Sequence, residues 1–71
     1  MNTQEYLKII GVNIKRIRLE KKLRQIDLAD LCDFDKSNMR RIEAGNTNLT
    51  INTLIKVAAS LEVDPIELLK H

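Results

Sequence analysis

The sequence has few of the residues that build small β proteins or disulfide-stapled domains. Two glycines and one proline in 71 residues are too few for the turns of a small sandwich or barrel. A single cysteine, Cys32, excludes an internal disulfide framework and a cysteine-rich metal cluster. Tyr6 and Phe34 are the only aromatic residues, so the core must come from Leu, Ile, Val and Ala. These absences favour packed helices in one domain over residues 1–71.

Membrane spans and catalytic sites are also missing from the sequence. No apolar run approaches the ~20 residues of a membrane helix, and the start MNTQEYLK does not resemble a signal peptide. We therefore expect a cytoplasmic protein. No Ser/His/Asp set, Cys/His pair or glycine-rich phosphate loop can be assembled, and the only histidine, His71, is expected to be disordered. We expect no enzyme activity, metal, cofactor or small-molecule effector.

The net charge of +2 is small, but it is unevenly distributed. Nine basic and five acidic residues lie between Lys15 and Arg41, whereas two basic and four acidic residues follow from Glu43 onward. A polyanion would therefore meet the first of these segments and not the second.

Apolar residues recur at three- and four-residue steps, the spacing of helices that bury one face. This pattern predicts an all-α bundle of five helices, at about residues 3–22, 25–32, 36–44, 51–61 and 65–70. The expected inward residues are Leu7, Ile10, Ile14 and Ile17 in the first, Leu28 and Ala29 in the second, Met39 and Ile42 in the third, and Ile51, Leu54, Val57, Ala58 and Leu61 in the fourth. Gly11, within the first helix, would be explained by a close packing contact.

Capping residues mark most of the helix ends. Polar residues expected to cap helix starts are Thr3, Asp35, Thr50 and Asp64, the last followed by Pro65. Gly45 can take the left-handed conformation that ends the third helix. At 100° per residue, Lys36, Ser37, Arg40, Arg41 and Ala44 fall opposite the buried side of this helix. Two short helices joined by a tight turn, the second with a basic outer side, have the helix-turn-helix plan.

The segments IKRIRLEKKLRQIDLADLC and FDKSNMRRIEAGNTNLTINTLIKVAASLEVDPIELL resemble the phage repressor and Cro-like helix-turn-helix family, also called the xenobiotic-response-element family. The resemblance runs from about Ile14 to Leu69, and its most specific parts are R-I-E-x-G and L-x-V-D-P-x-E-L-L. It implies a lambda-repressor-like domain whose second helix crosses the DNA backbone while the third lies in the major groove. The implied function is sequence-specific regulation of transcription on double-stranded DNA.

The resemblance also implies roles for single residues. Residues implied to contact bases are Lys36, Ser37, Arg40 and Arg41. Residues implied to contact the backbone or to support the site are Gln25, Asn38, Asn46, Thr47 and Asn48. Arg18 and Glu43 match positions that form a partly buried salt bridge in the family. Three positions depart from the family pattern: Arg24 replaces a serine or threonine cap, and Asp33 and Glu62 replace common glycines.

We expect a homodimer on a roughly palindromic operator, with an apolar interface of Val63, Ile66 and Leu69 to which Leu61 could add. The NLTINTL segment resembles stand-alone controller proteins of restriction–modification systems. Regulation would then come from concentration, a partner or dimer dissociation. Two alternatives are an antitoxin that binds its toxin through Leu19, Ile26 and Leu31, and a protein–protein module that uses this fold as a scaffold.

Overall fold

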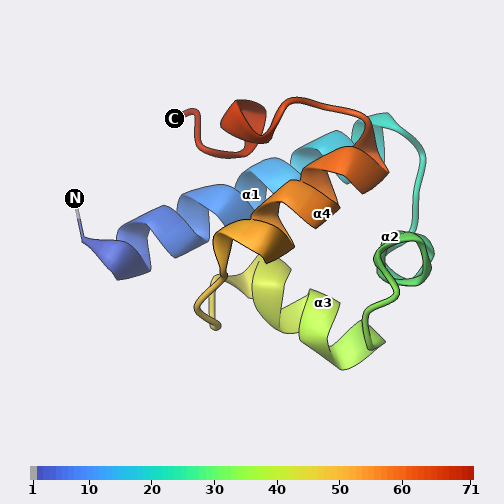
Figure 1. Cartoon of the computed structure of the whole chain (residues 1–71), viewed down its shortest axis with the longest axis horizontal. Coiled ribbons are helices and arrows are strands. Elements are labelled where there is room, and N and C mark those ends of the chain that lie inside the picture. The colour runs from blue at the N-terminus through green and yellow to red at the C-terminus, as the bar shows by residue number, and fades with distance from the viewer. Residues whose placement is uncertain (1) are drawn as a thin grey trace.

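The computed structural model describes residues 2–71, which form four α-helices and one 3₁₀ helix without any strand (Figure 1). The elements are α1 (Thr3–Glu20), α2 (Gln25–Cys32), α3 (Lys36–Ala44), α4 (Ile51–Leu61) and η1 (Pro65–Leu68). The all-α class is confirmed, and the observed bounds of α2, α3 and α4 agree with the expected ranges. The prediction of five α-helices is wrong, because the last element is a single 3₁₀ turn.

The end of the chain is held by α1 and does not continue as an α-helix. The buried Asn13 side chain donates from Nδ2 to the carbonyls of Leu68, at 2.9 Å, and Lys70, at 2.7 Å. In a longer helix these carbonyls would accept hydrogen bonds from backbone amides, whereas here they accept from the Asn13 side chain. His71, expected to be disordered, packs edge-to-face on Tyr6 with ring centroids 5.7 Å apart.

The helices pack around α1, which spans a molecule of 31 × 22 × 19 Å (Figure 1). α3 lies beneath α1 in this view and contacts both α1 and α2, while η1 returns along the opposite side of α1 to contact α1 and α4. α2 packs mainly against α3 and α4. The helix-turn-helix pair therefore sits at one edge of the molecule, supported by α1 and α4.

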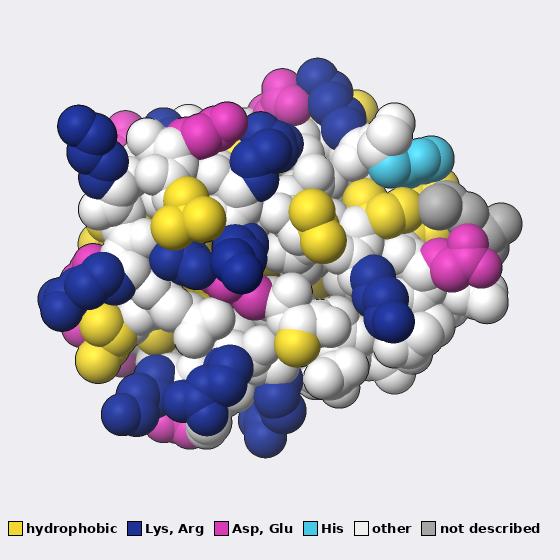
Figure 2. Space-filling model, turned by 180° about the vertical axis from the view of Figure 1, so that it is seen from behind, with side chains coloured by type: hydrophobic (Ala, Val, Ile, Leu, Met, Phe, Trp, Pro, Cys, Tyr) yellow, Lys and Arg dark blue, Asp and Glu magenta, His cyan; other side chains and the backbone are white. Residues whose placement is uncertain are grey.

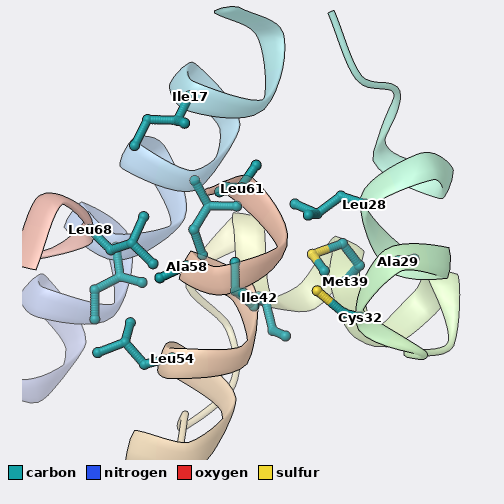
Figure 3. Packing of buried hydrophobic residues seen from close by; sticks show 13 residues of the cluster. Ile17, Leu28, Ala29, Cys32, Met39, Ile42, Leu54, Ala58, Leu61 and Leu68 are labelled. Carbon is teal, nitrogen blue, oxygen red and sulfur yellow. The ribbon is translucent and has the colours of Figure 1, made fainter. Parts of the chain in front are cut away.

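Every helix contributes to the apolar core, in which Met39 of α3 lies among Leu28, Ala29 and Cys32 of α2 (Figure 3). The Cys32 thiol is buried and bonded to the Ser60 hydroxyl at 3.3 Å, and this burial raises its pKa. The core residues are Ile10, Ile14, Ile17, Leu28, Ala29, Cys32, Met39, Ile42, Leu54, Val57, Ala58, Leu61 and Leu68. The expected inward residues other than Ile51 are buried, and Phe34 is half-buried against the core.

One expected core residue lies at the surface. Ile51, the first residue of α4, is 70% exposed. Leu61 is fully buried, so it cannot extend a dimer surface as anticipated. Leu68 of η1, absent from the expected core, is fully buried.

The helix caps agree with the sequence at two of the four expected sites. Thr50 accepts from the Thr53 amide at 3.1 Å, and Asp64 accepts from the Ile66 amide at 3.0 Å. The expected Thr3 cap is wrong, because Asn2 one residue earlier accepts from the Glu5 amide at 2.9 Å. The other error concerns Asp35, which precedes α3 but makes no side-chain bond to its amides. The Ser37 hydroxyl donates to the Asp35 carboxylate in their place.

Each α-helix is followed by a residue in the left-handed conformation. These residues are Lys22, Asp33, Gly45 and Glu62, with φ of 60°, 57°, 74° and 59°. α1 ends at Glu20, two residues before the expected end, and Lys21 and Lys22 form the turn that follows it. Only Gly45 adopts this conformation without steric cost, since the others carry a Cβ.

Candidate nucleic-acid interface

The turn between α2 and α3 is fixed by backbone bonds and by one half-buried aromatic ring. The Asp33 amide donates to the Asp30 carbonyl at 3.1 Å, and the Phe34 amide donates to the Ala29 carbonyl at 2.8 Å. Phe34 packs against the core, and the Lys56 amine of α4 lies 5.3 Å from its ring centroid. The angle between the two helices is therefore set by contacts on both sides of the turn.

α3 presses its backbone directly against α1. Its buried side is short, since only Met39 and Ile42 are buried. A Cβ added at Gly11 of α1 would come within 2.9 Å of the Ile42 carbonyl oxygen and 2.8 Å of the Glu43 carbonyl carbon. This close contact between α1 and α3 explains the glycine within α1, because any side chain at position 11 would push α3 away.

A buried ion pair joins α1 to α3. Arg18 Nε lies 2.7 Å from Glu43 Oε2, and Nη2 lies 3.0 Å from Oε1, a bidentate arrangement. The two side chains are only 8% and 4% exposed. Arg18 Nη1 also donates to the Leu23 carbonyl at 2.9 Å, and Gln25 Nε2 donates to Glu43 Oε1 at 3.1 Å. The structure therefore contains the Arg18–Glu43 pair that the resemblance implied, and it ties α1, the following loop, α2 and α3 together.

Gln25 is more than the surface group that the sequence indicated. Because its amide nitrogen carries two hydrogens, the bond to Glu43 leaves one of them free. The Gln25–Glu43 bond joins residues 18 positions apart, so no local pattern could have revealed it.

The outward side of α3 carries cations that no acidic side chain neutralises. Lys36, Arg40 and Arg41 are exposed and form no ion pair with any of residues 2–71. Figure 2 shows Lys and Arg side chains gathered along the lower edge of the molecule, where α3 lies. Ala44 is exposed beside them, while Ser37 and Asn38 are half-buried. The Ser37 hydroxyl donates its hydrogen to Asp35, which leaves the lone pairs of its oxygen free to accept a hydrogen bond from a ligand.

The basic residues elsewhere include several that are already paired. Arg16 contacts Glu20 at 3.3 Å, Lys70 contacts Glu67 at 2.9 Å, and Arg24 contacts Asp27 at 2.9 Å. The cations of α3, in contrast to these three, are available to a ligand without displacing an existing partner.

The start of α2 is built in an unusual way. The Asp27 carboxylate accepts from the Arg24 guanidinium at 2.9 and 3.1 Å and from the Arg24 amide at 2.7 Å. The side-chain bond from Arg24 is the main reason that the pKa of Asp27 lies below its ordinary value, and Asp27 in turn raises the pKa of Arg24. No side chain of the described residues accepts from the first amides of α2, so these donors remain free at the positive end of the helix.

The loop after α3 begins at a fixed point beside α1. The Asn46 amide donates to the Arg41 carbonyl at 3.0 Å, and Gln4 Nε2 donates to the Gly45 carbonyl at 3.1 Å. Asn46 and Asn48 are exposed and Thr47 is half-buried. Polar side chains of this loop therefore lie next to the end of the basic helix, as the sequence indicated.

An apolar surface lies on the other helices. Ile66 is 59% exposed and Leu69 is 37% exposed, whereas Val63 is half-buried against the core. Ile51 and Ile55 of α4 are exposed as well, and the periodicity did not single them out as surface residues. Of the surface residues suggested for an antitoxin, Leu19, Ile26 and Leu31 are all exposed.

Metal-binding clusters and membrane-spanning helices are both absent from the described residues. Residues 2–71 contain no cluster of three or more His, Cys, Asp or Glu side chains placed to hold a metal ion. None of the helices over this range is long and apolar enough to cross a membrane.

Comparison with known proteins finds a family and several relatives. A sequence model of the family described as helix-turn-helix matches residues 14–68. The immunity repressor protein of Bacillus phage phi105 is 37% identical over 54 residues, which cover 76% of this chain and 38% of that protein. Control protein C.BamHI of Bacillus amyloliquefaciens is 32% identical over 62 residues, covering 86% of this chain and 76% of that protein.

Among solved structures, a similar one is the restriction–modification controller protein C.Esp1396I, a tetramer in complex with its natural 35 base-pair operator. It shares 36% identity and a TM-score of 0.79, and the match covers 92% of this chain and 96% of that one.

Proposed function

The chain belongs to the helix-turn-helix family, and from that premise we propose that it is a sequence-specific DNA-binding regulator of transcription. In this proposal it binds a palindromic operator as a homodimer in the cytoplasm, where the nucleoid lies. The relatives named above are a phage repressor and control proteins. Their functions favour a repressor or a stand-alone controller over an antitoxin or a scaffold module.

The observation that carries the proposal is the contrast between the two sides of α3. Its inner side is fixed by burial and by the Arg18–Glu43 pair, while its outer side presents three unpaired cations. A helix of nine residues is marginal by itself. The rest of the molecule therefore holds a short basic helix at the surface in a fixed orientation, as reading the major groove requires.

Lys36, Ser37, Arg40 and Arg41 are the residues that we assign to base contacts. Lysine and arginine donate to the N7 and O6 acceptors of guanine, and each good pair discriminates against a wrong base by about 1–3 kcal/mol. The Ser37 oxygen can accept from a base edge while its hydrogen stays on Asp35, and the hydroxyl can donate to a base edge only once that bond is exchanged. Ala44 lets the DNA come close at the far end of the helix, because its side chain is small.

A second group of residues would hold the DNA backbone. In this proposal, the free hydrogen of the Gln25 amide and the open amides at the start of α2 bind one phosphate. Asn38 supports the first turn of α3, and Asn46, Thr47 and Asn48 bind the backbone beyond its end. Such contacts set the position of the protein on the duplex but carry no sequence information.

Two-fold symmetry would supply the remaining affinity. A single short helix contacts few base pairs, so a dimer that reads two half-sites one DNA turn apart is the usual solution. We assign the interface to Val63, Ile66 and Leu69, where apolar side chains reach the surface. The multimeric operator complex of C.Esp1396I supports this arrangement.

The test is fluorescence anisotropy with DNA from upstream of the protein's own gene and with a scrambled duplex, titrated across salt concentrations. We expect the intact protein to prefer its own DNA and to lose affinity steeply as salt rises. Arg41→Ala should lose the preference, whereas Arg16→Ala, which removes an exposed and already paired arginine of α1, should keep it. Equal binding to both duplexes by the intact protein would contradict the proposal.

A further inference from the structure

We propose that Lys8, in the first half of α1, is an additional contact to a DNA phosphate, placed there by its packing against Gly45. This inference rests on the proposed function. The apolar periodicity does not select Lys8, because it concerns apolar residues. The match to the family does not include Lys8 either, because it begins at residue 14.

The position of Lys8 follows from the glycine that ends α3. A Cβ added at Gly45 would lie 2.9 Å from both Cα and Cγ of Lys8 and 3.1 Å from its backbone nitrogen. The backbone of α1 and the start of the loop after α3 are therefore in direct contact. Gln4, one turn earlier on α1, bonds the Gly45 carbonyl at 3.1 Å. These two contacts hold the start of the loop against the first half of α1.

The charge of Lys8 is free to act on a ligand. Its side chain is exposed and makes no ion pair or hydrogen bond with the other described residues, including the exposed Glu5 one turn away. A lysine amine at the end of a flexible stem extends beyond the short side chains of the adjacent loop. Asn46 and Asn48 are the exposed members of that loop. A phosphate bound by the loop would therefore lie within the range of the Lys8 amine.

The contact would be electrostatic and would not read sequence. Lys8 flanks the C-terminal end of α3, whereas base contacts come from the N-terminal part of a recognition helix. Removing its charge should weaken binding to every duplex by the same factor, of several-fold. The slope of log affinity against log salt should become shallower by about one per protomer.

Lys15 offers a matched control on the same helix. It is also exposed and forms no ion pair in the described part of the chain, and it lies two turns further along α1. It lines a groove with Val12, Leu19 and Glu43, on the same side of α1 as Lys8 but about 10 Å further along the helix axis. Lys8→Gln and Lys15→Gln change the net charge equally, so a difference between them reports position and not total charge.

The experiment measures the affinity of the intact protein, Lys8→Gln, Lys8→Arg and Lys15→Gln for operator and scrambled DNA across salt concentrations. Thermal unfolding of each variant checks that the fold is unchanged. We expect Lys8→Gln to weaken binding to both duplexes equally and to reduce the salt slope, Lys8→Arg to restore both, and Lys15→Gln to change the slope less.

Three results would overturn the inference while leaving the proposed function standing. They are an unchanged salt slope for Lys8→Gln, the same loss for Lys15→Gln, and a loss confined to operator DNA. If the intact protein itself fails to distinguish the two duplexes, the proposed function fails first, and the salt slope of Lys8→Gln on scrambled DNA still tests the phosphate contact.

Discussion

α3 and α4 are neighbouring helices of nearly equal length, yet they are held in place differently. α4 buries Leu54, Val57, Ala58 and Leu61, whereas α3 buries only Met39 and Ile42. α3 gains additional support from the Arg18–Glu43 pair and from the missing side chain at Gly11. The outer side of α4 carries isoleucines and that of α3 carries cations.

The difference shows how a small apolar core can support a helix whose polar outer side is proposed to contact DNA. Apolar burial stabilises α4 without directional requirements, at about 1.5–3 kcal/mol for each large side chain. Burial alone would leave α3 free to slide or tilt, because two side chains define no unique orientation. A bidentate ion pair and a backbone contact are directional, so they fix the angle at which the helix presents its cations. Substitutions at these supports would test this division.

Arg18→Ala should affect α3 most. It leaves the Glu43 carboxylate buried without its cation, which costs about 3–5 kcal/mol of unfolding free energy. Urea unfolding followed by circular dichroism measures this loss. Arg16→Ala, at an exposed i,i+4 pair, should cost under about 0.5 kcal/mol. Similar small losses for both variants would show that the buried pair does not hold α3.

Ile66→Asp should separate the proposed dimer and leave the protomer folded. Each protomer would lose one buried apolar side chain of at least about 1.5 kcal/mol. Because a two-fold interface contains the residue twice, the dissociation constant should rise by about a hundredfold. Sedimentation velocity across protein concentrations reports this change. Leu19→Asp, on the exposed side of α1, serves as the control and should leave the dimer intact.

Gly11→Ala should destabilise the fold although alanine is the better helix former. The added methyl group would overlap the carbonyls of Ile42 and Glu43, and such overpacking costs about 1–3 kcal/mol. Thermal unfolding compares it with Val12→Ala, a change at an exposed neighbour. A gain of about 1 kcal/mol, the value that helix propensity alone would give, would show that α1 and α3 are not in close contact.

Glu62→Gly should stabilise the end of α4, by up to about 1 kcal/mol, because Glu62 occupies a left-handed conformation that glycine adopts without a Cβ clash. A glycine introduced inside the helix, in Ala59→Gly, should destabilise by about 0.5–1 kcal/mol. Chemical unfolding of both variants checks the opposite signs. A loss for Glu62→Gly would mean that its side chain makes a contact of greater value than the backbone strain.

The smallest effect concerns pH. The bond from Arg24 lowers the pKa of Asp27 in the folded state, so this group stabilises the fold above its unfolded pKa of about 3.9. That stability is lost as pH falls through the lower, folded pKa. Asp27→Asn should therefore flatten the acid side of a plot of melting temperature against pH. Arg24→Ala should flatten the plot in part, because it removes the guanidinium bonds to Asp27 and keeps the bond from the backbone amide. An unchanged plot for Asp27→Asn would contradict this account.

Much of the fold followed from local patterns. α2, α3 and α4 have apolar periodicity and clear end signals, and their bounds could be read from these. The errors occurred where two local options compete. Asn2 and Thr3 are both good caps, and the carboxylate of Asp35 binds the Ser37 hydroxyl in preference to the helix amides. The 3₁₀ end could not be foreseen, because it depends on Asn13, 55 residues before Leu68.

The residues of the proposed site also fall into those that the sequence could place and those that only the packing of the helices brings together. The cations of α3 could be placed on one side of a helix from their spacing alone. The bond between Gln25 and Glu43 and the contact between Lys8 and Gly45 join distant parts of the chain. They depend on how the helices pack, which no local pattern records. Ile51 was misplaced because periodicity identifies one side of a helix but not which positions on that side are covered by the rest of the molecule.

The most direct test of the division between α3 and α4 is a titration of isotope-labelled protein with its own upstream DNA, followed by backbone amide chemical shifts at fixed protein concentration. The largest changes should fall on Lys36 to Ala44, on the loop from Asn46 to Asn48 and on the start of α2. The outward amides of α4 should change little. Changes concentrated on α4, with α3 unaffected, would contradict the assignment of α3 as the helix that reads DNA.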